Sequence, residues 1–166
     1  PVLLHPRLAS HLRSGQVSRV IYGSIIGLAL ILTLEAHPPR VAVVVGTLVA
    51  TALAVALAEL YSELVGTSAR ASLGGSTESV GTIVADTAAV AFGIAFPCVF
   101  FVAVAFGLIG YETAFALSKW TGLGLIAGYG YLAARLSGSG TLRALLHAAV
   151  AGLIGAILIA LKALVH

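Results

Sequence analysis

The sequence predicts an all-α, polytopic membrane protein with five transmembrane helices, an inner N-terminus and an outer C-terminus. Apolar residues make up 60% of its 166 residues and charged residues only 9%, whereas about 25% of the residues of an ordinary soluble domain are charged. The mean hydropathy is +1.09. A helix needs roughly 20 apolar residues to cross a bilayer, and stretches of this kind lie at about 20–36, 41–65, 83–107, 114–136 and 142–165. We therefore expect a multi-pass protein of the cell membrane, with the lipid bilayer as its surroundings.

The segments outside these stretches are polar or rich in turn residues. Residues 1–19 lack the apolar core and cleavage site of a signal peptide, and are expected to form either an amphipathic helix on the inner membrane surface or an arm attracted to anionic lipid. Pro38 and Pro39 cannot continue a helix, so residues 35–40 are predicted to form a short outer hairpin. Residues 66–82, rich in Gly and Ser, are predicted to form the longest inner loop.

The basic residues set the predicted orientation, because short cytoplasmic loops are enriched in Lys and Arg. An inner N-terminus places six of them on the inner side and three on or near the outer side: Arg7, Arg13, Arg19, Arg70, Arg135 and Arg143 against Arg40, Lys119 and Lys162. Their positions between apolar segments make them topology signals, so nucleic acid is not an expected partner. Small residues four apart, as in Gly23 and Gly27 or Gly124 and Gly128, are typical of close helix packing in lipid.

Catalysis finds little support in the sequence, and no enzymatic activity is expected. There is no His-Glu-x-x-His zinc helix and no phosphate-binding Gly loop followed by Lys. The single Cys98 cannot form a disulfide or a cysteine-based metal site within one chain, and its apolar neighbours favour a small packing residue. No bound cofactor is expected.

The acidic residues are the candidate site. Glu59 and Glu63 lie one helical turn apart at the end of the second apolar stretch, which is otherwise uncharged. Charges within membrane helices are costly and often functional. With Asp86 they would lie near the inner face, where carboxylate oxygens can bind a divalent cation or exchange it for protons. Alternatively, the two glutamates reach cytoplasmic water and pair with Arg70 or Arg135.

Two further interpretations concern the remaining acidic residues. Glu35 and His37 flank the proline hairpin and form a weaker candidate metal or proton site, although such residues are also common in a solvated loop. Asp86 stands at the start of the predicted third span, so it could instead cap that helix, where the helix dipole favours negative charge.

The chain resembles the vacuolar iron transporter-like family in three places. The segment Arg19–Leu28, with its Tyr22–Gly23 pair, is similar to the family's opening segment, and Ala58–Glu59–Leu60 stands where the family has Gly-Glu-Tyr. The third similarity runs from residue 134 to residue 156. The resemblance implies five helices, export of Fe²⁺ or Mn²⁺ in exchange for protons, and a homodimer whose transport path lies between the first two spans of each subunit.

The sequence also departs from this family. Ile26 stands where the family has an aspartate, the position of a family methionine falls near Thr67, and the acidic cytoplasmic helical domain is reduced to the loop at 66–81. Only Glu59 matches a family ligand. On this resemblance Gly23 and Gly27 would face the dimer axis, and paired copies of Glu59 and Glu63 would form a four-carboxylate cluster.

Three hypotheses for the function follow from these features. The first is proton-coupled transport of a divalent cation, Fe²⁺ or Mn²⁺, past Glu59 and Glu63. The second is a non-transporting structural or accessory membrane subunit on the same scaffold, the loss at Ile26 having removed the transport chemistry. The third is a small oligomeric channel lined by small residues.

Overall fold

The computed structural model is all-α, as predicted, and describes residues 14–72 and 79–165. Within these ranges the chain forms six helices, which are α2 (Ser14–Ala36), α3 (Val41–Ser72), α4 (Val80–Ala95), α5 (Cys98–Ala105), α6 (Tyr111–Leu136) and α7 (Thr141–Val165). Residues 14–19, predicted as part of an N-terminal arm at 1–19, belong to α2. Residues 1–13 of that predicted arm lie outside the described part of the chain.

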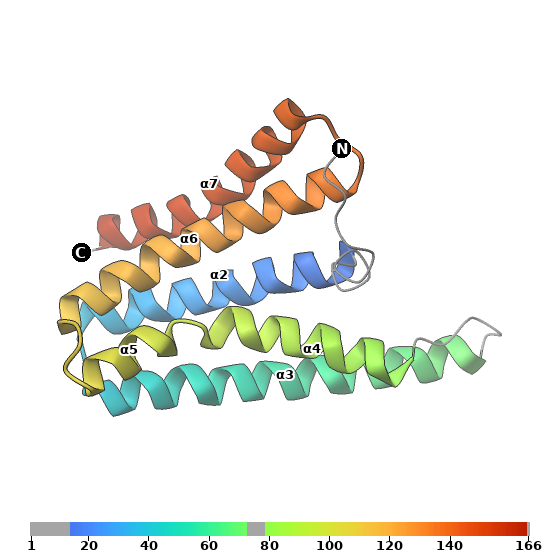
Figure 1. Cartoon of the computed structure of the whole chain (residues 1–166). Helices are drawn as coiled ribbons and strands as arrows, with labels where there is room; N and C mark the ends of the chain where they lie inside the picture. Colours follow the sequence, from blue (N-terminus) through green and yellow to red (C-terminus); the bar gives the residue numbers. More distant parts are fainter. Residues whose placement is uncertain (1–13, 73–78, 166) are drawn as a thin grey trace.

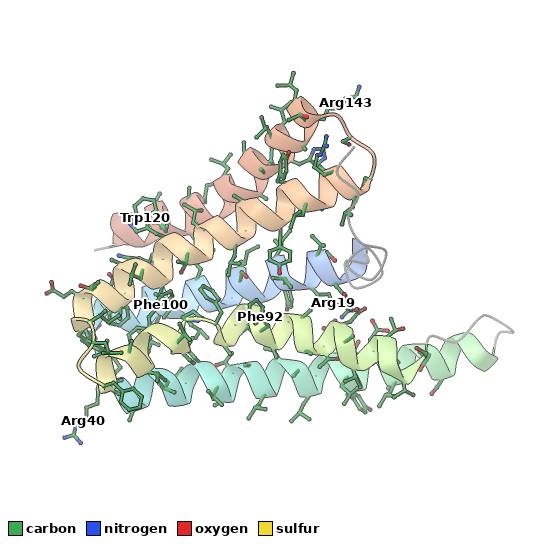
Figure 2. The ribbon with its side chains drawn as sticks, in the orientation of Figure 1. Arg19, Arg40, Phe92, Phe100, Trp120 and Arg143 are labelled. Atoms are coloured by element: carbon green, nitrogen blue, oxygen red, sulfur yellow. The ribbon has the colours of Figure 1, made fainter. Side chains whose placement is uncertain are left out.

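The helices form a layered bundle with α2 near its middle (Figure 1). On one side of α2 lie α6 and then α7, and on the other side α4 and α5 lie between α2 and α3. Successive helices run in alternating directions, except that α5 continues in the direction of α4, so α2 and α4 are parallel. One end of the bundle holds Arg19 and Arg143, and the opposite end holds Arg40 and Trp120 (Figure 2); we call these the Arg19 end and the Arg40 end.

The predicted third span, 83–107, is wrong as a single helix. It consists of α4 and α5, which meet at an angle of 48°. Pro97 lies at the break and has no N–H, so the carbonyl of Gly93 loses its helical donor and the helix bends.

The predicted inner loop at 66–82 is also wrong at its start, because α3 continues to Ser72. The hydroxyls of Thr67 and Ser68 both donate to the carbonyl of Leu64 at 2.9 Å, so these polar side chains bond within the helix. The next helix begins after Ser79, whose hydroxyl accepts from the backbone N–H of Thr82 as an N-cap. Residues 73–78 of the predicted loop lie outside the described part of the chain.

By length and hydropathy, the described helices include three candidate membrane spans, or four if α4 and α5 form one broken span. These are fewer than the five predicted, because α6 does not meet the same test. Its first half carries Glu112 and Lys119 beside Ser118 and Thr121.

Aromatic rings and glycines hold the bundle together. At the Arg40 end, the buried ring of Phe101 meets Tyr111 and Phe115 edge to face, at centroid distances of 5.9 and 4.9 Å. In the middle of α2, the backbones of α2 and α4 are in contact, because a Cβ added to Gly93 would lie 2.6 Å from the amide nitrogen of Ser24. This close contact sets the register of α2 against α4.

Candidate functional site

Four charged side chains from three helices meet at the Arg19 end. Arg19 of α2 forms ion pairs with Glu59 and Glu63 of α3 and with Asp86 of α4. The Arg19 Nη2 to Glu63 Oε1 distance is 2.7 Å and the Nε to Asp86 Oδ2 distance is 3.5 Å. Figure 2 shows Arg19 on the side of α2 that faces α4 and α3. We call these four residues the Arg19 cluster.

Helix packing places Arg19 beside the carboxylates. Gly23 lies one turn after Arg19 and packs against the backbone of Val90, which lies one turn after Asp86. Because the two helices are parallel, contact at Gly23 and Val90 puts Arg19 opposite Asp86. Glu59 and Glu63 complete the cluster from one face of α3, since residues four apart lie above one another.

The cluster carries an excess of negative charge in a partly buried setting. The side chains of Arg19, Glu59, Glu63 and Asp86 are 20%, 26%, 23% and 13% exposed. With all four groups ionised, three carboxylates of the cluster surround one guanidinium. Partial burial makes such a charge excess more costly than in water.

The cluster lies close to one boundary of a bilayer that α3 would cross. Glu59 is 18 residues after Val41, the start of α3, which is about 27 Å along the helix at 1.5 Å per residue. The hydrocarbon core is about 30 Å thick. If α3 spans a bilayer from Val41, Glu59 lies near the depth where hydrocarbon gives way to headgroups.

Both glutamates pair with Arg19, and the predicted pairing with Arg135 is wrong, because Arg135 donates to the Ser139 carbonyl and to the Thr141 hydroxyl, both at 3.4 Å. The predicted pairing with Arg70 stays a prediction. The side chain of Arg70 lies outside the described residues. Arg19 was interpreted from sequence only as a topology charge, because its partners depend on how α2 packs against α4.

The capping role predicted for Asp86 is wrong. Because α4 begins at Val80 with Ser79 as its N-cap, Asp86 lies in the second turn of the helix and points to Arg19. The expectation that Gly23 and Gly27 face a dimer axis is also wrong. Both glycines pack against the backbone of α4 in the same chain, and Ile26 packs against the core formed by Ala52, Val90 and Ile94.

The weaker candidate pair, Glu35 and His37, lies at the Arg40 end. Glu35 Oε1 accepts from Lys119 Nζ of α6 at 2.6 Å, with both side chains 25% exposed. This ion pair joins the end of α2 to α6, as the Arg19 cluster joins its beginning to α3 and α4. Nearby, the Tyr111 hydroxyl donates to the carbonyl of Pro39 and fastens the proline hairpin to α6.

Among the described residues, no group of three or more His, Cys, Asp or Glu side chains has the arrangement of a metal site. In the Arg19 cluster the guanidinium lies among the carboxylates, so a cation could bind there only after displacing Arg19. The ligand roles of Glu59, Glu63 and Asp86 stay predictions.

Three hydroxyl groups in the described core have no hydrogen-bond partner, those of Ser24 on α2, Thr87 on α4 and Ser118 on α6. Thr87 follows Asp86 directly, and Ser24 lies five residues after Arg19. Ser118 precedes Lys119, which pairs with Glu35. Buried hydroxyls in proteins usually bond to protein or to ordered water. These three hydroxyls are therefore polar groups within the otherwise apolar core.

Comparisons with known proteins add no assignment to this site. No family of proteins matches the chain, and neither a curated protein nor a solved structure matches it. The resemblance to iron transporter-like proteins therefore stays a prediction based on short motifs. The chemistry of the Arg19 cluster is the ground for a functional proposal.

Proposed function

We propose that the protein carries a divalent cation across the membrane in exchange for protons, and that the Arg19 cluster is the exchange site. One observation carries the proposal: three of the six acidic residues in the chain converge on a single guanidinium. Three carboxylates held close together supply both the negative charge and the oxygen atoms that a divalent cation, or the protons exchanged for it, would bind. Ionisable side chains in membrane helices are rare and often mark substrate or ion pathways.

In this scheme the guanidinium of Arg19 occupies the site when no metal ion is bound. A hard cation such as Mn²⁺, or the borderline Fe²⁺, takes oxygen ligands, and Glu59, Glu63 and Asp86 offer up to six carboxylate oxygens. Binding displaces the guanidinium, which the partly open site allows to turn toward water. Protons that bind to the carboxylates release the metal, since a neutral acid is a poor ligand.

The proposal includes five spans, with α4 and α5 as one broken span and α6 as a span whose polar groups face neighbouring helices. Lys119 is paired with Glu35, and Ser118 is buried, so these α6 residues lower its hydropathy without facing lipid. Broken helices are frequent in transporters. Arg19, Arg135 and Arg143 at one end favour an inner N-terminus in the cell membrane.

Flux through proteoliposomes tests the proposal. Purified protein in vesicles with an inside-acid pH gradient should take up Mn²⁺, and Glu59→Gln should reduce the rate at least tenfold. The matched control is Glu112→Gln, because Glu112 is an exposed carboxylate in the first turn of α6, at the Arg40 end. Equal flux in the wild type and Glu59→Gln would rule out this role for Glu59.

A second candidate function is structural, as an accessory membrane subunit. It is favoured by the ion pairs of Arg19, because they join α2 to both α3 and α4. In that case Glu59→Gln should lower the stability of the bundle, and neither the wild type nor the variant should transport Mn²⁺. Stability and flux, measured on the same preparations, distinguish the two functions.

A further inference from the structure

A groove opens between α2, α6 and α7 at the Arg19 end, away from the Arg19 cluster. Its volume is about 430 Å³ and its walls are almost wholly apolar. Ile21 comes from α2, Ala133 from α6, and Leu146, Val150 and Ile154 from α7. His147 supplies a polar edge.

The end of this groove is positively charged. Arg143 lies one turn before His147 on the same stripe of α7, and the His147 Nδ1 donates to the Arg143 carbonyl at 2.9 Å. Arg143 also lines a second hollow of about 490 Å³, formed with Ser137 and Ser139 of the loop between α6 and α7. The described part of α7 has no acidic residue, and the one on α6, Glu112, lies at the opposite end.

The size of the groove decides between kinds of occupant. A helix about 10–12 Å wide fills about 500 Å³ for each turn, so this groove would hold less than one turn of a partner helix. A flexible hydrocarbon chain has no such minimum width. The apolar walls and the cationic end therefore fit an amphiphile with one acyl chain in the groove and a negative headgroup at Arg143.

We propose that this groove binds an anionic phospholipid, with an acyl chain along Ile21, Ala133 and Val150. The phosphate accepts hydrogen bonds from the Arg143 guanidinium. Anionic lipids are concentrated in the cytoplasmic leaflet, where each nearby Lys or Arg adds to their binding. The bound lipid would contact α2, α6 and α7 together and so stabilise their packing, independently of any transport at the Arg19 cluster.

Native mass spectrometry of the detergent-solubilised protein tests this proposal. With equal amounts of phosphatidylglycerol and phosphatidylcholine added, the wild type should retain phosphatidylglycerol preferentially. Arg143→Gln should weaken its retention about fivefold, the effect of one basic residue near an anionic surface. Val150→Phe, which fills the groove, should weaken retention of both lipids.

The matched control is Arg40→Gln, which removes an exposed arginine at the opposite end of the bundle (Figure 2) and should leave retention unchanged. Equal retention of the two lipids by the wild type would overturn the proposal. So would an equal loss of phosphatidylglycerol in Arg40→Gln and Arg143→Gln. Arg143 is exposed, so Arg143→Gln should fold. The test therefore stays decisive even if Val150→Phe does not fold.

Discussion

Replacing Gly23 with Ala should separate α2 from α4. A Cβ at position 23 would collide with the carbonyl oxygen of Val90 and would lie 3.0 Å from its carbonyl carbon and 3.1 Å from its Cα. These are backbone atoms in the middle of a helix, so no side-chain rotation relieves the contact. Overpacking costs about 1–3 kcal/mol, and a contact with rigid backbone belongs at the upper end of that range.

Alanine also gains about 0.5–1 kcal/mol over glycine in a helix interior, so the net loss for Gly23→Ala should be about 2 kcal/mol. That loss corresponds to a fall in Tm of about 4–8 °C for a chain of this size. The control is Gly124→Ala on α6, because nothing lies within 4 Å of a Cβ placed there. Circular dichroism during heating in detergent measures both. If Gly23→Ala melts at or above the wild-type temperature, α2 and α4 do not pack as described.

Three other substitutions test separate contacts by chemical denaturation. Arg19→Gln should lower the free energy of unfolding by about 2–3 kcal/mol, because it removes the guanidinium from among three partly buried carboxylates. The exposed Arg40→Gln should change the free energy of unfolding little, and similar losses in the two variants would contradict the cluster. Lys119→Gln should lower the free energy of unfolding by about 1 kcal/mol, and the double variant with Glu35→Gln should recover part of that loss. Strictly additive losses in the two single variants would mean that the pair does not interact. Phe101→Ala removes a ring that is 0% exposed and should cost about 3–5 kcal/mol; a loss below 1 kcal/mol would contradict its place in the core.

The helix ends that depend on local chemistry were predictable from sequence. The proline pair at Pro38 and Pro39 separates helices that end at Ala36 and begin at Val41, as predicted. The same property of proline breaks the third span at Pro97, but the uninterrupted apolar residues around it gave no other sign of a break. The extension of α3 to Ser72 was hidden because Thr67 and Ser68 favour loops unless they bond back into their own helix.

The composition of the site was only partly predictable. Glu59, Glu63 and Asp86 stand out in sequence because charge is rare in apolar stretches. Their partner Arg19 depends on the parallel packing of α2 on α4, a contact between residues far apart in the chain. Periodicity within one helix carries no information on such contacts, so the sequence left Arg19 as one basic residue among several.

The central claim is that the carboxylates of the Arg19 cluster bind a divalent cation in place of the guanidinium. Electron paramagnetic resonance of free Mn²⁺, titrated with purified protein at neutral pH, measures this binding directly. The wild type and Glu112→Gln should each remove Mn²⁺ from solution, and Asp86→Asn combined with Glu59→Gln should not. Absence of binding to the wild type, or equal binding to the double variant, would contradict the claim.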